Sequence, residues 1–349
     1  MSQIASTLFE QGKTYFEKSE VLPIITDFLQ TLPNAATDPE ALWLASEAVL
    51  RTITLQSGLL IERARDIYSF SHLTFQEYLT ARKIAARCLK DPTDVLHQLA
   101  QHTSERRWNE VILLTLSLLP KAAPLLNDMK QAVDALAREN STLQQALQWV
   151  NQKAKTAPAH LKPAAVKAFY LPLCYNQDLS LALALDDAFA FDLDPSLALD
   201  LAIARTYQHI QQLGEKPTYE HILNLWFALD FGRQFPREVR LNQALAELKA
   251  QFPSLDRHEL EWQTWWKIHR TDWLKQFHER VLEPLNMDFC WQLSALQQQT
   301  LWEHYRTNQF LVACLNSECS VDSAIRSHIE ITLLSDSITA VPLPCVVRP

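Results

Sequence analysis

Apolar residues recur at three- and four-residue spacing along most of the chain, which is the pattern of helices that bury one face. The segment Thr37-Asp38-Pro39-Glu40 is a typical helix start, with a capping side chain, a proline in the first turn and an acid beside it. Gly58 can end that helix in the left-handed conformation. The predicted helices span residues 4–17, 22–32, 39–56, 91–103, 107–119, 125–137, 142–155, 180–186, 196–200, 219–231, 236–251, 260–281, 295–315 and 323–334.

A different pattern lies between residues 59 and 70. Residues 59–63 and 67–70 are rich in apolar and β-branched side chains and flank the tip Ala64-Arg65-Asp66, which predicts two short strands in a hairpin. Helices followed by a hairpin are the outline of a winged helix. The sequence therefore predicts a mainly α fold: an N-terminal winged-helix-like segment with one short β-hairpin, followed by an all-α helical array.

Another helix is predicted directly after the hairpin. Thr74 and Glu77 have the spacing of a capping box, and Leu73 and Tyr78 stand at the positions of a hydrophobic staple. This spacing places His72 two residues ahead of the helix start. First-turn N–H groups and the helix dipole attract anions, so a histidine beside them can add a donor for a phosphate oxygen.

The composition agrees with a helical fold and does not point to any particular activity. Only 4 residues are Gly while 17 are Pro, which fits helices joined by short, proline-marked turns. The 32 basic and 40 acidic residues give a net charge of −8, which disfavours general binding to nucleic acid or to an anionic membrane. Six cysteines spread over the chain predict reduced thiols in a cytoplasmic protein.

The apolar runs predict neither a targeting segment nor a membrane span. Residues 1–20 lack the basic start and the continuous apolar stretch of a signal peptide. Residues 111–119, the most apolar run, are about half as long as a spanning helix and contain Thr115 and Ser117. We expect this run to form a buried helix.

Asp91-Pro92 and the stretch from Gly214 to Pro217 are the candidate boundaries between domains. They divide the chain into a winged-helix region at 1–90, a helical domain at 91–215 and a C-terminal helical domain at 216–340. Residues 341–349 hold three prolines and are expected to form an irregular tail.

Residues 58–64 (GLLIERA) and 67–78 (IYSFSHLTFQEY) resemble the winged-helix segment at the C-terminal end of bacterial NACHT proteins, which belong to the STAND class of signalling NTPases. Residues 12–58 are similar to the cyanobacterial branch of that family. Trp291-Gln292 and residues 311–319 resemble the C-terminal Cys/His-containing helical domain of such proteins. The resemblance covers nearly all of the chain and is loosest at about residues 120–220.

The resemblance implies a role for one residue in particular. In the family, the histidine of the string Phe-x-His-x-Thr-Phe-Gln-Glu-Tyr-Leu contacts a phosphate of bound ADP and helps to hold the inactive state. That histidine corresponds to His72, while Phe75, Glu77 and Tyr78 would be structural supports. The alternative for His72 is a buried, hydrogen-bonded core histidine on the strand face that carries Tyr68 and Phe70.

A complete P-loop is not found in the sequence. Gly12-Lys13-Thr14 has the ending of the motif, but the position of its first glycine is Thr7, and residues 8–18 are predicted as helix. No apolar run ends in the paired acids that would hold Mg²⁺. We therefore expect no NTPase activity and no cofactor in this chain, although the family implies ATP or ADP, and we expect the chain to begin inside the NACHT region.

Two other groups of residues are expected to be structural. Cys314 and Cys319, with Cys290 and His304 nearby, do not have the spacing of a zinc knuckle and are expected to be core thiols, with no metal. Trp262, Trp265, Trp266 and Trp273 stand at helical spacing beside acids, which favours a packed core over base stacking.

The winged helix is expected to pack against protein. Residues 1–95 carry a net charge of −3, and the candidate recognition helix 39–56 contains Arg51 as its one basic residue, so few phosphate contacts are available. We expect a non-catalytic regulatory or sensor portion of a NACHT signalling protein, in prokaryotic signal transduction or antiviral defence. Its expected partner is a protein or a separately encoded NACHT core. The alternative is a stand-alone helical scaffold with a vestigial winged helix.

Overall fold

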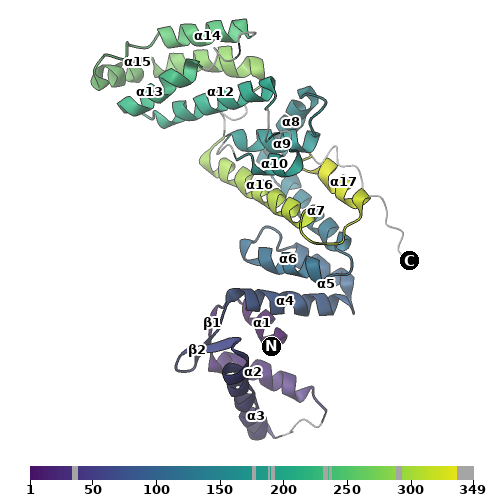
Figure 1. Cartoon of the computed structure of the whole chain (residues 1–349). Helices are drawn as coiled ribbons and strands as arrows, with labels where there is room; N and C mark the ends of the chain where they lie inside the picture. The colour runs from purple at the N-terminus through teal and green to yellow at the C-terminus, as the bar shows by residue number, and fades with distance from the viewer. Residues whose placement is uncertain are drawn as a thin grey trace. The chain divides into compact units, whose positions relative to one another are not determined.

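The computed structural model describes residues 1–33, 38–174, 178–187, 189, 193–230, 235, 238–287 and 293–335 (Figure 1). The chain divides into two compact units, each treated separately below. Unit 1 comprises Met1–Val133 and Ala313–Ser327, and unit 2 comprises the described residues of Asp134–Val312 and His328–Pro349. Helices dominate both units, so the mainly α fold class is confirmed. Among the described helices, none combines the length and the apolar character that a bilayer span requires.

Unit 1 begins with a winged helix built around a three-stranded antiparallel sheet. The strands lie side by side in the order β1-β3-β2. The elements are α1 (Ser2–Glu10), β1 (Tyr15–Glu17), α2 (Lys18–Gln30), α3 (Pro39–Thr52), a π-helical turn (Ile53–Ser57), β2 (Leu60–Ala64), β3 (Ile67–Phe70) and α4 (Leu73–Cys88).

The predicted hairpin is confirmed, and a third strand joins it. Strands β2 and β3 pair with Leu60 opposite Phe70, and an irregularity in register lies between Glu62 and Ala64. Strand β1 pairs on the other side of β3, with Phe16 opposite Tyr68. The predicted helix 4–17 is therefore wrong beyond Glu10, because its last three residues form this strand.

Gly12 explains why the first helix stops. Its φ of +71° is left-handed, and its N–H donates to the Phe9 carbonyl at 2.9 Å while the N–H of Lys13 donates to the Leu8 carbonyl at 2.9 Å. These two bonds form a Schellman motif, which closes the last turn of a helix. The chain leaves α1 in a new direction and enters β1 three residues later.

The winged helix has its own apolar core. Strand β1 contributes Phe16, which is almost fully buried, and helix α4 contributes Leu79. Helix α4 packs along α1 and α6, so it lies between the wing and the helices that follow. Further core residues come from α1, α2, α3, β2 and β3: Ile4, Leu8, Val21, Leu22, Ile25, Leu50, Leu60, Tyr68 and Phe70.

The rest of unit 1 is helical. Arg107 links it to the first helix, since its Nη1 donates to the Phe9 carbonyl at 3.0 Å and its Nη2 to the Glu10 carbonyl at 3.3 Å. The apolar run at 111–119 lies in a helix whose residues Val111, Ile112, Thr115 and Leu116 are buried, as expected. The further elements are α5 (Pro92–Ala100), a 3-10 turn (Arg106–Trp108), α6 (Asn109–Leu118) and the start of α7 (Ala123–Arg138).

The described elements of unit 2 are all helices or helical turns. The predicted bounds of α16 agree with the structure, while α9 is missing from the prediction because prolines flank it. The expected domain boundaries at residues 90, 215 and 340 stay predictions. The elements are α8 (Ser141–Thr156), α9 (Pro163–Tyr170), α10 (Ser180–Leu185), α12 (Pro195–Gln212), α13 (Tyr219–Ala228), α14 (Val239–Ala250), α15 (Glu259–Phe277), α16 (Ala295–Leu315), α17 (Ser323–Thr332) and the turns Leu171–Cys174, His278–Leu282 and Glu283–Leu285.

Candidate functional site

The start of helix α4 is fixed by the hairpin that precedes it. Gly58, with a φ of +61°, ends the π-helical turn and lets the chain enter β2. At the other end of the hairpin, the N–H of Ser71 donates to the Leu59 carbonyl at 2.9 Å. This bond extends the pairing of β2 and β3 to the last residue before His72. The position of His72 therefore follows from the register of the sheet.

His72 is the N-cap residue of α4 and is exposed. Its backbone is extended, its side chain makes no capping bond, and its ring meets the ring of Phe75 edge-on with centroids 5.8 Å apart. The interpretation of His72 as a buried core histidine is wrong, because the strand ends at Phe70 and the face that carries Tyr68 and Phe70 is not continued.

The predicted capping box and hydrophobic staple are wrong. Helix α4 begins at Leu73, so Thr74 lies inside the first turn, and the N–H of Phe75 bonds to the His72 carbonyl at 3.1 Å. Leu73 and Tyr78, which would form the staple, are both exposed. The helix start comes two residues earlier than predicted because the end of strand β3 sets it.

Three features at this helix start favour an anion. The first turn of α4 contains no acid that would neutralise the helix dipole. The Oγ of Ser71 is buried and has no hydrogen-bond partner among the described residues. His72 stands next to it with its ring exposed to solvent. A hydroxyl, an imidazole and first-turn N–H groups therefore lie within three consecutive residues.

Phe75 and Tyr78 continue this surface along the helix. They follow His72 at three-residue spacing, and 39% of Phe75 and 42% of Tyr78 are exposed. We call His72, Phe75 and Tyr78 the α4 face. Both residues are partly buried within this chain and leave aromatic surface exposed at helical spacing. Their expected role as supports of the fold stays a prediction.

Gln76 and Glu77 lie on the other side of the same string. Gln76 is 2% exposed, and its Nε2 donates to the Lys13 carbonyl at 3.1 Å, so it ties α4 to the turn after α1. Burial raises the pKa of Glu77, and the nearby charge of Glu110 raises it further. The structural role of Gln76 is missed by the sequence analysis, because its partner is a backbone carbonyl 63 residues away.

Gly12-Lys13-Thr14 forms the C-terminal cap of α1. The N–H groups of Gly12 and Lys13, which a P-loop would turn toward phosphates, donate to carbonyls of α1 instead. The ammonium of Lys13 is paired with Glu20. The segment connects a helix to a strand, whereas a P-loop connects a strand to a helix. The predicted helix 8–18 is wrong at this point, as noted above.

The cysteine candidates are largely buried. Cys314 is fully buried, and this burial raises the pKa of its thiol strongly. Cys319 is partly exposed, and its thiol donates to the Cys314 carbonyl at 3.4 Å. His304 is buried, whereas Cys290 lies outside the described residues, as does Trp291-Gln292. Within the described part of the chain, no three His, Cys, Asp or Glu residues are grouped so that they could hold a metal ion.

The tryptophan group is a packed core, as predicted. Trp262, Trp266 and Trp273 are almost fully buried, and each indole N–H donates to a backbone carbonyl of unit 2 at 3.0 to 3.2 Å. The ring of Trp273 stacks on the ring of Phe277. Trp265 is partly buried and lies against its neighbours. These rings are occupied by protein contacts.

The N-terminal part of the chain is thus a winged helix, and the described elements that follow it are helices. Comparison with protein families agrees. Residues 1–84 match the model of the winged helix-turn-helix domain C-terminal to NACHT, and residues 241–336 match NACHT C-terminal helical domain 2. Two regions of the chain thus match NACHT-associated domains, consistent with the C-terminal part of a NACHT protein. The predicted resemblance is confirmed.

The two matched models describe accessory domains, and neither describes an NTPase domain. Neither of them covers residues 85–240, which include the stretch where the resemblance is loosest. The search of curated proteins gave no match, and neither did the search of solved structures.

Proposed function

We propose that this chain is the non-catalytic regulatory part of a NACHT signalling protein, and that it acts by protein–protein recognition and by restraint of a NACHT NTPase core. The observation that carries the proposal is the α4 face: an exposed histidine at a helix start, followed by two exposed aromatic residues. A group that this chain does not use internally is available to a partner.

In the proposed complex, His72 contacts a phosphate of ADP that is bound to the core. The first-turn N–H groups of α4 and the Ser71 hydroxyl would donate to the same anion. The nucleotide itself is held by the core, since Gly12 and Lys13 use their N–H groups to cap α1. Phe75 and Tyr78 pack against the surface of the core.

Other parts of the winged helix favour a protein partner over nucleic acid. Trp43 and Leu44 are exposed on helix α3, the candidate recognition helix. Lys18 lies 2.6 Å from Glu47 of the same helix α3 in an ion pair, so the positive charge of Lys18 is already neutralised. An apolar and acidic helix surface suits protein contact and offers little to phosphates.

The helical array would recognise the trigger, and the winged helix would pass the change to the core through His72. The wider setting that the family resemblance implies is prokaryotic signal transduction or antiviral defence in the cytoplasm. This chain supplies the restraint, and the core supplies nucleotide binding and hydrolysis.

Association with a NACHT core that is expressed as a separate chain tests the proposal. We expect binding that is tighter with ADP than without it, and His72→Ala should weaken the ADP-dependent part by about tenfold, the value of a charge-assisted hydrogen bond. His258→Ala is the matched control, because His258 is also an exposed N-cap residue with extended backbone and no capping bond, on α15. Absence of binding at micromolar concentrations, or equal binding of the His72 variant, would favour the scaffold alternative.

A further inference from the structure

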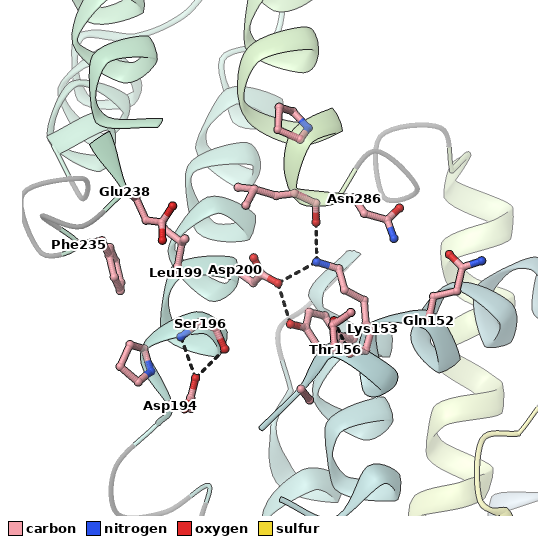
Figure 2. Close-up of a pocket in the computed structure, with 15 residues that line it drawn as sticks. Gln152, Lys153, Thr156, Asp194, Ser196, Leu199, Asp200, Phe235, Glu238 and Asn286 are labelled. Carbon is pink, nitrogen blue, oxygen red and sulfur yellow. Dashed lines mark hydrogen bonds and ion pairs between the residues drawn. The ribbon is translucent and has the colours of Figure 1, made fainter. Parts of the chain in front are cut away.

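A cavity of about 980 Å³ lies in unit 2 (Figure 2). Its walls come from the C-terminal half of α8, from α9, from the N-terminal half of α12, from the residues before α14 and from the turn that contains Leu285 and Asn286. Cavities that hold small organic ligands have volumes of roughly 300–1,000 Å³. The proposed function above makes no use of this cavity.

A buried charge network forms one wall. Lys153 Nζ donates to Asp200 Oδ2 at 2.8 Å and to the Leu285 carbonyl at 2.7 Å, and Tyr170 Oη donates to the same Asp200 Oδ2 at 2.7 Å. The side chains of Lys153 and Asp200 are only 7% and 9% exposed. Burial raises the pKa of Tyr170, so its hydroxyl keeps the proton that it donates.

One carboxylate oxygen of Asp200 accepts no hydrogen bond from the described residues. Both donors of the network converge on Oδ2, and the described residues provide no hydrogen-bond donor to Oδ1. The side chain of Asp200 is nine-tenths buried and lines the cavity, so a ligand bound there can supply a donor to Oδ1.

The charges around the cavity select the kind of ligand. Asp194, Asp200 and Glu238 line it together with one lysine, Lys153, so its charged side chains have a net charge of −2. Hydrogen bonds from Ser196 lower the pKa of Asp194, which keeps that carboxylate ionised. Glu238 is exposed, and its carboxylate has no partner among the described residues. This potential attracts cations and repels phosphates and carboxylates.

The remaining wall is suited to an organic molecule. Leu199, Phe235 and Pro284 line the cavity between the charged groups, and Figure 2 shows Phe235 and Leu199 on the same side as Glu238. A bare metal ion is a poor fit, because the described residues do not place three metal-ligating side chains together. A ligand with an apolar body and one positively charged donor group matches both the apolar and the acidic parts of the lining.

We propose that this cavity is a binding site for a small organic cation, an amine or a guanidine on an apolar or aromatic body. The charged group donates to Asp200 Oδ1, Glu238 and Asp194 provide the attractive potential, and the body packs against Leu199, Phe235 and Pro284. Such a ligand would tie α8, α12 and the 283–286 turn together, and would stabilise unit 2 when bound.

Binding of four small probes to the full chain tests this site, by saturation-transfer NMR and calorimetry at low salt. Phenethylammonium and agmatine carry the cation, phenethyl alcohol has the same body without the charge, and hydrocinnamate has the opposite charge. We expect the cations to bind about tenfold or more tightly than the alcohol, and hydrocinnamate not to bind. Equal affinity for phenethylammonium and phenethyl alcohol, or no binding of either cation at millimolar concentration, would overturn the proposal.

Two variants locate the site. Glu238→Gln should weaken binding of phenethylammonium about two- to fivefold, the effect of one exposed charge, and leave the circular dichroism unchanged. Glu215→Gln, an exposed acid of the same unit outside the cavity, should have no effect. Asp200→Asn should abolish the preference for the cation if the variant remains folded. An unchanged affinity in Glu238→Gln would show that the cation binds elsewhere and would overturn the assignment.

Discussion

The start of α4 and the network around Lys153 each contain an ionisable side chain, but one is exposed to solvent and the other is buried. His72 is exposed, has no hydrogen bond through its side chain in the described structure, and meets the ring of Phe75 edge-on. Lys153 is buried and bound to Asp200 and to the Leu285 carbonyl. Removing an unattached surface group tests recognition, whereas removing a buried one changes stability first. The difference separates the two roles experimentally.

Breaking the buried pair should have the largest effect. Lys153→Met leaves Asp200 as an uncompensated charge inside unit 2, and we expect a loss of about 3–5 kcal/mol in the free energy of unfolding. Denaturant unfolding followed by tryptophan fluorescence measures this loss. Lys155→Met, which removes an exposed lysine of the same helix, is the control and should change stability by less than about 0.5 kcal/mol. Equal losses in both variants would mean that the pair is not buried.

The same contrast exists inside one helix, between Gln76 and His72. Gln76→Leu removes the donor to the Lys13 carbonyl and should lower the free energy of unfolding by about 1–3 kcal/mol. His72→Ala should stay within about 0.5 kcal/mol of the parent chain, because His72 is exposed and its side chain makes no capping bond. Urea titration of the two variants gives both values. A large loss in His72→Ala would place that residue in the core and weaken the proposed role.

The helix starts provide a third comparison. Asp38 caps α3, since its Oδ2 accepts from the N–H of Ala41 at 2.9 Å, and Asp38→Ala should cost about 1 kcal/mol. Thr74 lies inside the first turn of α4, so Thr74→Ala should have little effect on stability. Thermal melting of both variants distinguishes the two positions. A loss of similar size in Thr74→Ala would restore the capping box that the structure replaces.

The smallest expected effect depends on pH. The pKa of Glu77 is higher in the folded chain than in the unfolded chain, so its protonated form favours folding, and this contribution is lost as the pH rises through the folded pKa. Glu77→Gln should therefore raise the melting temperature slightly at pH 7 and make no difference below about pH 4. Melting curves at the two pH values measure the effect. A gain of equal size at both would contradict the assigned cause.

The fold could be predicted from the sequence wherever the pattern is local. The hairpin, most of the helices and the buried tryptophans follow from spacing that lies within one segment. Strand β1 could not be found in this way, because only Phe16 of its three residues is buried and its partner strand is some fifty residues away. The end of α1 was also hidden, since Gly12 in the left-handed region breaks a pattern that otherwise continues as a helix.

The site was predicted in part. His72 lies at a helix start, as expected, but the sequence predicts that the helix is capped at Thr74, two residues too late. The true start depends on the bond between Ser71 and Leu59, which ends the hairpin just before His72. The capping-box pattern contains no information about that bond. The cavity in unit 2 leaves no local signal. Lys153 and Asp200 are 47 residues apart, and each alone has the pattern of an ordinary charged position on a helix.

Hydrogen exchange in the winged helix gives the most direct test of the central claim, that the α4 face is where this chain meets a nucleotide-bound NACHT core. The amides of residues 71–78 should become strongly protected when the ADP-bound core is added, and less so with the core alone, while the amides at the start of α15 should not change. Unchanged exchange at 71–78 in a mixture that demonstrably forms a complex would contradict the claim.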